Sequence, residues 1–532
     1  MASGFSVAIL LILFFSLSHA KHHHHLPPEI RGACKASRDP STCEASFHHH
    51  FPSNLTALQI IYSALGRSSH KLTKAQAAVK DILKSSAGNI NVTVAARNCV
   101  EGLDYSEYRF KQTVNDALAR GEMKDARAWM SAALGYQHGC SSGLKKVNDT
   151  SRVRQTIVLM ESLIGFTSDT LGMIMNYDIH GNQIASWSPP KTEREGFWEA
   201  VRGTREVKGG VPWSLKPNVT VCKVGNCGYR RVQDAVNAAP NNLVSQRFVI
   251  WIKAGMYDEI VRVPMAKTNL VFLGDGMGKT VITGSLNVGG MANSGVTTFE
   301  SATVGVVGDG FMARDVTIQN TAGADAQQAV AFRSSSDHSI IENCEFLGNQ
   351  DTLYVNSLRQ YYKSCRIQGN IDFIFGNAAA LFQDCDILVA PRIVNPENGE
   401  TNVVTAHGRI EPGQSTGFIF HNCSINGTAQ YMKSYYSNPS VHKTFLGRPW
   451  KEYARTVFLQ CRFGDLINPA GWMPWSGEFA LNTLYYGEFG NTGAAANAKE
   501  RVLWSSQIPP QHVYTYSLQN FIQGDQWIPL SS

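Results

Sequence analysis

Two short segments of the same form stand 21 residues apart and each carries an aspartate: Asn349-Gln-Asp-Thr-Leu-Tyr and Asn370-Ile-Asp-Phe-Ile-Phe. A cysteine lies seven residues before each aspartate, Cys344 before Asp351 and Cys365 before Asp372. A fixed period near twenty with short β-prone segments is typical of a coil whose turns stack on one another. Equivalent positions on adjacent turns lie one strand spacing apart, about 4.8 Å. The sequence therefore predicts two carboxylates side by side on neighbouring turns.

Paired carboxylates of this kind suit acid–base or nucleophilic chemistry. At an effective dielectric constant of about 20, two charges about 5 Å apart repel by about 3 kcal/mol, or about two pK units. One pKa is expected to rise while the other stays low, which sets a proton donor beside an anion. The alternative is two turn aspartates that cap strand ends. The neighbouring Tyr354, Phe373, Phe375 and Gln350 favour a site.

The segments around this pair repeat a polar–Cys–polar–apolar pattern that turns every second side chain inward. The repeat runs through Arg314-Asp-Val-Thr-Ile-Gln-Asn, Asn343-Cys-Glu-Phe, Ser364-Cys-Arg-Ile, Asp384-Cys-Asp-Ile, Asn422-Cys-Ser-Ile and Gln460-Cys-Arg-Phe. Short β-branched runs broken by glycine begin upstream, at 248–252, 269–273 and 280–283. We therefore predict a parallel β-helix over residues 216–532, with a loop excursion between Cys385 and Cys423.

A helical region precedes the β-helix. Helix formers with apolar residues three and four apart predict four amphipathic helices, over 72–86, 95–120, 124–136 and 153–175. These indicate an up-and-down bundle over residues 21–175. Residues 176–215 carry tryptophans, Pro189-Pro190 and Gly209-Gly210 without a clear period, and are interpreted as a linker.

Composition and the N-terminus indicate a secreted globular protein of more than one domain. The chain has 532 residues, 17% charged, with a net charge of +6 that is too mild to identify a partner. Residues 1–20 are interpreted as a signal peptide, because the apolar run is too short to span a bilayer and small residues follow it. No later run is apolar enough for a membrane helix. We expect an extracellular location, with no membrane or nucleic-acid partner.

A secretory route would allow the cysteines to form disulfides and the asparagines to be glycosylated. The 11 cysteines are disulfide candidates, and none has zinc-ligand spacing, so we expect no metal and no cofactor. Candidate glycosylation sites of the form Asn-x-Ser/Thr begin at Asn54, Asn91, Asn148, Asn218, Asn422 and Asn426.

The segments GNQDTLY and DFIFG resemble the signatures of plant pectin methylesterases. Four further segments agree in the family's order: GMYDE (255–259), QNTAG (319–323), QAVAFR (328–333) and LGRPW (446–450). One such segment would be weak, whereas six in order are specific. The resemblance implies a right-handed parallel β-helix that hydrolyses the methyl esters of cell-wall pectin.

The resemblance also implies a role for each site residue. Asp372 corresponds to the nucleophile and Asp351 to the acid that protonates methanol and then activates water. Gln328 and Gln350 correspond to the oxyanion-stabilising glutamines. Arg448 corresponds to the arginine that holds the nucleophile, a role that suits its planar, charged fork. The aromatic residues that correspond to those of the cleft are Tyr354, Phe375, Trp450 and Trp472.

The helical region resembles the pectin methylesterase inhibitor domain, through residues 95–108 and 126–140. The family's pairing implies the disulfides Cys34–Cys43 and Cys99–Cys140. For the β-helix we expect Cys222–Cys227 and, by resemblance, Cys385–Cys423. Cys344 and Cys365 either pair or stack, and Cys461 is left over. The bundle is expected to restrain the enzyme, and separate inhibitor proteins are possible partners; the alternative is a folding aid or spacer.

The chain departs from the family at His407, where glutamine is usual, and at Asn349, where tyrosine is usual.

Two rival functions remain open. Another β-helix carbohydrate enzyme, a lyase or a glycosidase, would use carboxylates differently, although a retaining glycosidase's separation of about 5–5.5 Å is close to the rung spacing. A non-catalytic inhibitor or wall-binding protein is the second. The arginine and the two glutamines favour the esterase.

Overall fold

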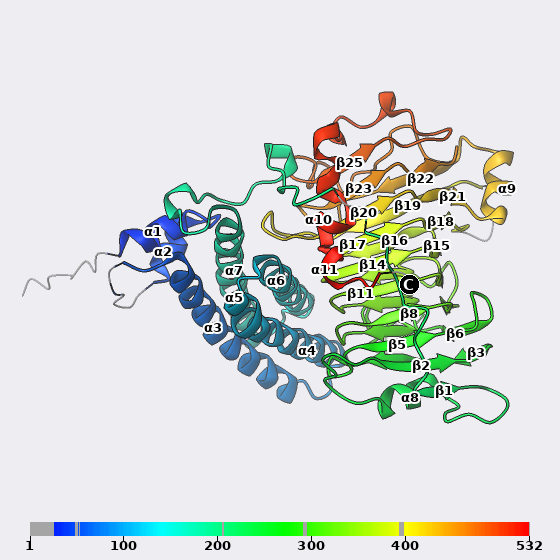
Figure 1. Ribbon diagram of the computed structural model, residues 1–532, viewed down its shortest axis with the longest axis horizontal. Helices are drawn as coiled ribbons and strands as arrows, with labels where there is room; N and C mark the ends of the chain where they lie inside the picture. The colour runs from blue at the N-terminus through cyan, green and yellow to red at the C-terminus, as the bar shows by residue number, and fades with distance from the viewer. Residues whose placement is uncertain are drawn as a thin grey trace, which may run out of the picture.

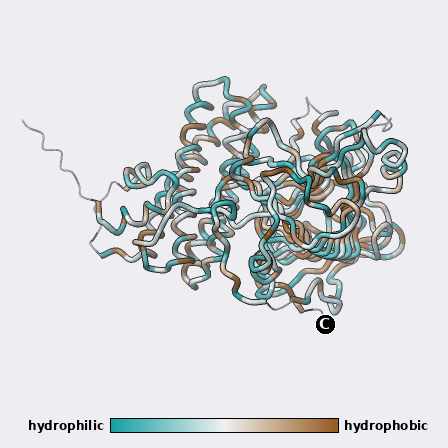
Figure 2. Tube along the Cα trace, turned by 90° about the horizontal axis from the view of Figure 1, so that it is seen from above, coloured by the Kyte–Doolittle hydropathy of each residue, from teal (hydrophilic) through white to brown (hydrophobic). Residues whose placement is uncertain are grey.

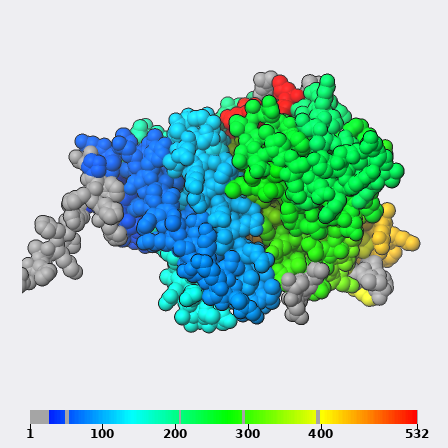
Figure 3. Space-filling model, turned by 90° about the horizontal axis from the view of Figure 1, so that it is seen from below, coloured from blue at the N-terminus to red at the C-terminus, as the bar shows by residue number. Residues whose placement is uncertain are grey.

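The computed structural model describes residues 26–47, 52, 54–204, 207–290, 295–392 and 398–530. The predicted signal peptide, residues 1–20, lies outside them. A helical bundle stands beside a stack of parallel strands (Figure 1), and the two surfaces meet directly (Figure 3). The two-part architecture predicted from the sequence is confirmed.

Four long helices make the bundle, and each begins before the residue that the periodicity predicted. They are α3 (Ala57–Ser85), α4 (Ile90–Gln112), α6 (Met123–Lys145) and α7 (Ser151–His180), with a π-helical turn at Thr113–Ala117, α5 at Leu118–Arg120, and the short α1 (Pro28–Cys34) and α2 (Pro40–Ala45) at the start. Side-chain caps fix three of the starts: Thr56, Asn89 and Thr150 each accept a backbone N–H of the first turn. The helices therefore extend through polar positions that apolar periodicity alone does not mark.

By length and composition, α7 could cross a membrane, so the expectation that no run after the signal peptide is apolar enough for a membrane helix is wrong. Half of its most apolar window is buried in the protein, and α7 packs against α3 and α6. A core helix of a bundle meets the same criteria. It also runs five residues past the predicted end of the bundle at 175.

Three parallel sheets form the β-helix, and buried apolar side chains make its core. Figure 2 shows the stacked turns from above, with hydrophobic residues along them. The eleven-stranded sheet contains β1 (Val219–Val221), β2 (Phe248–Ile252), β5 (Leu270–Leu273), β8 (Met312–Arg314), β11 (Ser339–Glu342), β14 (Arg359–Lys363), β17 (Ala379–Gln383), β20 (Gly417–His421), β23 (Arg455–Leu459), β25 (Tyr485–Phe489) and β26 (Ser506–Gln507). The eight-stranded sheet contains β3 (Gly255–Asp258), β6 (Thr280–Gly284), β9 (Thr317–Asn320), β12 (Glu345–Leu347), β15 (Arg366–Gly369), β18 (Asp386–Val389), β21 (Ser424–Gly427) and β24 (Arg462–Phe463).

The seven-stranded sheet carries the predicted site. Its strands are β4 (Val261–Val263), β7 (Val304–Val306), β10 (Phe332–Ser334), β13 (Leu353–Val355), β16 (Ile371–Gly376), β19 (Glu400–His407) and β22 (His442–Gly447). Tyr354 pairs in register with Phe375, which is the 21-residue offset predicted from the sequence. The repeat therefore positions equivalent residues on adjacent rungs, as expected.

The repeated cysteines mark the corner between two sheets. The polar residue before each one adopts a left-handed conformation, with φ of 50° at Asn343, 52° at Ser364 and 55° at Asp384. Short polar residues tolerate this region, and the bend turns the chain into the eight-stranded sheet. The amide of Asn422 donates to Asp384 on the next rung at 2.6 Å. These side-chain bonds tie successive corners together.

The expected Cys385–Cys423 disulfide is wrong. Both residues are free and buried, as are Cys344, Cys365 and Cys461. Their thiols point into the core and lie against backbone carbonyls, for example Cys385 Sγ against Gln383 O at 3.3 Å. They stack as small apolar residues, one per rung. The disulfides Cys34–Cys43, Cys99–Cys140 and Cys222–Cys227 are present as predicted.

Short helices complete the β-helix. They are α8 (Val232–Ala238) at its first rung, α9 (Ala429–Ser437), α10 (Leu518–Ile522) and α11 (Gly524–Trp527). The apolar face of α8 packs into the core through Val232, Ala235 and Val236. The Glu259 carboxylate of the GMYDE segment accepts the backbone N–H of Val232 at 2.9 Å and of Gln233 at 3.1 Å. This segment therefore holds a helix end.

Candidate active site

The two predicted aspartates lie on adjacent rungs, where two inner strands of the seven-stranded sheet begin. Asp351 lies two residues before β13 begins, and Asp372 is the second residue of β16. The backbone N–H of Asp351 donates to Ile371 O at 3.1 Å, which joins the two rungs. Both aspartates have left-handed backbones, φ 66° and 49°. Such backbone strain concentrates at functional sites.

Arg448 holds Asp372 in a bidentate pair. Its Nε donates to Oδ1 at 2.8 Å and its Nη2 to Oδ2 at 2.6 Å. Arg448 immediately follows β22, two rungs from β16, and Asp372 is 5% exposed. A guanidinium fork fixes both the charge and the orientation of a carboxylate.

The pKa of Asp351 is raised well above its usual range, first by burial and then by the charge of Asp372, while Arg448 opposes the rise. Burial also raises the pKa of Asp372, and Arg448 opposes that rise through its hydrogen bonds and its charge. The expectation that the second pKa stays low is therefore wrong, because burial was not included. The order is as expected, because the pKa of Asp351 is raised well above its usual range, while the hydrogen bonds and charge of Arg448 limit the rise at Asp372.

The two glutamines border the carboxylates. Gln350 adjoins Asp351 in the chain, and the Gln350 carbonyl accepts the N–H of Ala329, the residue after Gln328. Both glutamines are half-buried. Uncharged amide donors next to a carboxylate pair suit a developing oxyanion.

Aromatic side chains form one wall beside the aspartates. Tyr354 stacks on Phe375 with centroids 4.2 Å apart, and Phe375 meets Trp450 edge-on at 5.9 Å. Gly376 ends this row with φ 130°, and a Cβ there would lie 1.9 Å from Val355 O, so only glycine fits. Tyr354 and Trp450 are half-buried and offer flat apolar surface to a sugar ring.

Trp472 is not part of this wall. It is 1% exposed, stacks on Tyr486 at 4.1 Å and donates its indole N–H to Glu488. The prediction that it contacts substrate is therefore wrong, because its aromatic type does not distinguish core from cleft. Trp475, which sequence reasoning missed, is 37% exposed, and the Arg448 guanidinium lies over its ring at 4.4 Å. Its place three residues after Trp472 was the available signal.

Neither departure from the family pattern bonds an aspartate of the site among the described contacts. His407 is fully buried and its Nδ1 accepts the Arg455 backbone N–H at 3.0 Å. Burial, with Arg455 and Arg409, holds the pKa of His407 well below its usual range, so the ring is neutral. Asn349 accepts a hydrogen bond from Asn370, at 3.2 Å. Both residues have structural contacts.

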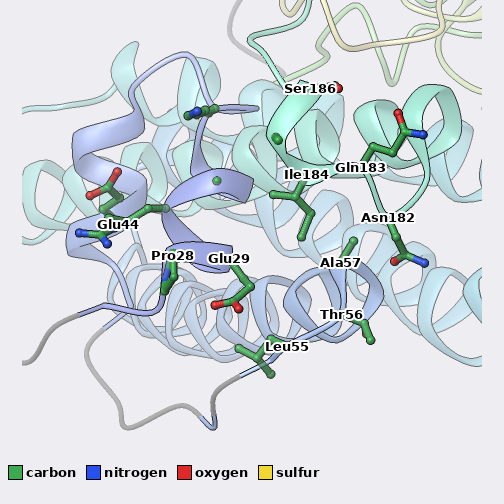
Figure 4. A pocket seen from close by; sticks show the side chains of 14 residues that line it. Pro28, Glu29, Glu44, Leu55, Thr56, Ala57, Asn182, Gln183, Ile184 and Ser186 are labelled. Carbon is green, nitrogen blue, oxygen red and sulfur yellow. The ribbon is translucent and has the colours of Figure 1, made fainter.

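A separate pocket of about 1100 Å³ lies in the bundle (Figure 4). It is lined by α1, the start of α3 and residues 182–186, with Glu29, Glu44 and Leu55 among them. It contains none of the predicted site residues, so its size does not mark the reaction centre. The described residues contain no group of three or more His, Cys, Asp or Glu placed to hold a metal.

The six predicted glycosylation asparagines are all exposed in the described structure. Carbohydrate at these positions would not disturb the core, and their modification stays a prediction.

The bundle packs against the β-helix next to the site, through α4 and α6 (Figure 1). Arg109 forms a bidentate pair with Asp309, both bonds at 2.7 Å, and the Tyr136 hydroxyl bonds Ser357 at 2.7 Å. Leu358 and Ile410 of the β-helix pack into the apolar core of the bundle. The linker also binds the β-helix, because Glu193 accepts from Arg455 at 2.7 Å.

The fold and the site together define a β-helix hydrolase with an attached helical domain. The family model Pectinesterase matches residues 218–525, and the model Plant invertase/pectin methylesterase inhibitor matches residues 28–173. The chain therefore belongs to the pectinesterase family of carboxylic ester hydrolases, and it carries that family's inhibitor-type domain.

Named relatives agree with this assignment. The chain is 57% identical over 510 residues to "Probable pectinesterase/pectinesterase inhibitor 64" of Arabidopsis thaliana, covering 94% of this chain and 84% of that protein. It is 38% identical to "Pectinesterase 2" of Citrus sinensis, covering 100% and 99%. The solved "Pectin methylesterase from Carrot" superposes with a TM-score of 0.55 and 48% identity, over 59% of this chain and 95% of that one.

Proposed function

We propose that this protein removes methyl groups from pectin through a covalent intermediate on Asp372. One observation carries the proposal: Arg448 holds the Asp372 carboxylate in a bidentate pair, while burial and the Asp372 charge keep Asp351 protonated beside it. A fixed anion next to a neutral acid is the arrangement that nucleophilic ester cleavage needs.

In the first half-reaction, an Asp372 oxygen attacks the ester carbonyl carbon, and the carbonyl oxygen gains the negative charge. The amide N–H groups of Gln328 and Gln350 stabilise that oxyanion. When the tetrahedral intermediate collapses, the C–O bond to the methoxy group breaks. Asp351 gives its proton to this group, methanol leaves, and an acyl anhydride remains on Asp372.

In the second half-reaction, the ionised Asp351 takes a proton from water as the water oxygen attacks the acyl carbon. The bond to Asp372 breaks, and the galacturonic acid unit that is released loses its remaining proton to solvent. Asp372 returns to its pair with Arg448, and Asp351 is protonated again. Tyr354, Phe375 and Trp450 provide apolar surfaces for the flanking sugar rings.

Two variants test this assignment. Asp372→Asn should fold normally and release no methanol, because an amide cannot form the anhydride. Asp351→Asn should slow both half-reactions, and an ester with an activated leaving group should restore only the first, so that the acyl group accumulates on Asp372. Mass spectrometry locates the adduct. An adduct on another residue, or normal methanol release from either variant, would contradict this mechanism. New reducing ends instead of methanol would support a glycosidase or a lyase.

We propose further that the attached bundle restrains the enzyme. Support comes from the Arg109–Asp309 pair and the Tyr136–Ser357 bond, which hold α4 and α6 next to the Tyr354 rung. The test places a protease site at residues 205 and 206. Methanol release is then compared before and after the folded chain is cut at this site. Activity should rise on cutting and separation. Equal activity before and after would favour a folding aid. Separate inhibitor proteins would be expected to compete for the surface that the bundle covers.

We propose that the protein is secreted and works in the cell wall. Three disulfides among the described residues and six exposed glycosylation motifs support an oxidising, secretory route. N-terminal sequencing of the secreted protein would identify the start of the mature chain. A start at Met1, or retention inside the cell, would contradict the proposal.

A further inference from the structure

A row of side chains runs along the outer face of the seven-stranded sheet and leads to the active site. The residues in register, one per strand, are Arg262, Gly305, Arg333, Tyr354, Phe375 and Ala406. Their chain neighbours, such as Phe332 and Leu353, point into the core. The row therefore starts at two arginines and continues into the aromatic wall beside Asp351 and Asp372.

The two arginines of the row differ in their contacts. Arg262 donates to Ala302 O at 2.6 Å and to Glu300 O at 2.7 Å. Arg333 is 2% exposed, and its Nε and Nη1 are buried without a hydrogen-bond partner among the described residues. Its guanidinium lies 3.4 Å from the Phe299 ring centroid, in space that the missing side chain of Gly305 leaves free. A buried guanidinium without a partner is costly unless it serves a ligand.

One face of α4 covers this arginine. Asn98, Glu101, Tyr105 and Arg109 follow one another at helical spacing, so they share that face. At its two ends, Asn98 donates to Thr297 at 3.4 Å and Arg109 pairs with Asp309.

Between these two anchors, Tyr105 donates a hydrogen bond to Glu101. Burial lowers the pKa of Arg333, and Tyr105 and Glu101 are the first two groups that oppose this effect. The bundle thus sets a carboxylate opposite Arg333 without a direct bond between them among the described contacts.

We infer that Arg333 is a subsite for the free carboxylate of a galacturonate unit next to the ester being hydrolysed, and that Glu101 stands in for this carboxylate in the whole chain. The inference rests on the proposed function. A planar guanidinium binds a carboxylate through two charge-assisted hydrogen bonds, which a neutral methyl ester cannot match. Pectin carries a carboxyl group on every unit of its backbone, so a chain bound across the aromatic wall presents one to Arg333.

The consequence is a preference for partly demethylated pectin. Once one unit has lost its methyl group, its new carboxylate can occupy the Arg333 subsite while a neighbouring ester reaches Asp372. Each product then improves binding for the next reaction, which favours consecutive demethylation along the polymer.

The test measures binding without turnover, by calorimetry in the Asp372→Asn background after the bundle has been cut and separated. The ligands are an unesterified and a fully methyl-esterified galacturonate hexamer. Arg333→Gln should weaken binding of the unesterified hexamer about tenfold, the effect of losing one hydrogen-bonded charge pair. It should weaken the esterified hexamer by less than about threefold, and Arg333→Lys should recover part of the loss. Equal losses for both hexamers would overturn the inference.

The stand-in role of Glu101 is tested in the uncut chain. Glu101→Gln removes the only carboxylate of this α4 face and should raise methanol release. Glu107→Gln is the matched control, because Glu107 lies on the same helix but binds Gln76 and Lys111 at the exposed surface of the bundle. If both variants behave as the parent chain, Glu101 does not occupy the subsite. A failure of the proposed function would give a different result, because no cut chain would then release methanol. The affinities for the two hexamers would still show whether Arg333 binds a carboxylate.

Discussion

Replacing Arg448 by glutamine should move the whole pH profile of the enzyme upward. The guanidinium and the Asp372 carboxylate form two hydrogen bonds of 2.8 and 2.6 Å. With charge centres about 4 Å apart and an effective dielectric constant of about 20, their attraction is about 4 kcal/mol. The Arg448 side chain is 21% exposed, so solvent replaces part of the lost charge and the upward shift of the Asp372 pKa is smaller than the full attraction implies.

The sign follows from the protonation states in the mechanism. Asp372 must be ionised to attack, so activity rises as the pH passes its pKa, and a higher pKa moves this acidic limb to higher pH. Arg448 also opposes the rise in the pKa of Asp351, so its loss raises that pKa too. Asp351 must be protonated to release methanol, so the alkaline limb moves in the same direction.

The assay is methanol release from the cut chain across the pH range, analysed as kcat/KM. Arg448→Gln should show both limbs displaced upward and a maximum lower by about a hundredfold, because the nucleophile loses its orientation. Lys443→Gln, an exposed position on the same strand β22, should leave the profile in place. A lower rate with both limbs unmoved would refute the reasoning, because Arg448 would then not control the carboxylate charges.

Arg109→Met breaks a buried pair with Asp309, a change that typically costs about 3–5 kcal/mol, and should raise methanol release from the uncut chain. Lys84→Met removes an exposed pair with Asp81 on the bundle surface and should change little; equal effects of the two would contradict the interface. Burial raises the pKa of Asp169 in α7 to about 6, above its unfolded value near 3.8. The folded state therefore binds the extra proton, and this stability is full below about pH 3.8 and is lost as the pH rises through 6, by at most about 3 kcal/mol. Urea unfolding followed by helical circular dichroism should show this loss, and Asp169→Asn should abolish it; a parent chain more stable at pH 6.5 than at pH 4.5 would argue against the assignment.

The sequence was most informative where one short-range rule decided the structure. The 21-residue interval predicted that Asp351 and Asp372 lie on adjacent rungs, since an inward–outward alternation and a fixed turn length leave little other choice. Helix boundaries were less accurate, because the start of α3 depends on the Thr56 cap and not on apolar spacing. The left-handed corners at Asn343 and Ser364 were missed, although a short polar residue before each repeated cysteine was the signal.

Long-range packing produced the errors. Trp472 and Trp475 are only three residues apart, yet one is buried and the other exposed, and no local pattern separates them. Cys385 and Cys423 look like a pair by resemblance, but their rungs stack them as thiols in the core. The pKa of Asp372 was expected to stay low because only charge was counted, whereas the burial that raises it is set by packing that local sequence does not show. The isolation of Arg333 likewise depends on α4, more than 200 positions earlier in the chain.

The position of α8 at the first rung has a consequence for how the molecule behaves in solution (Figure 1). A coil of stacked strands has an open cross-section at its end, where the interior apolar residues and unpaired backbone groups of the last turn would face water. Such an end is a template on which another copy could continue the stack into a filament. Val232, Ala235 and Val236 plug the opening, and Glu259 keeps the plug in place by binding its first turn. A fragment that begins after residue 239 would retain every catalytic residue, yet it would polymerise end to end instead of remaining a separate enzyme.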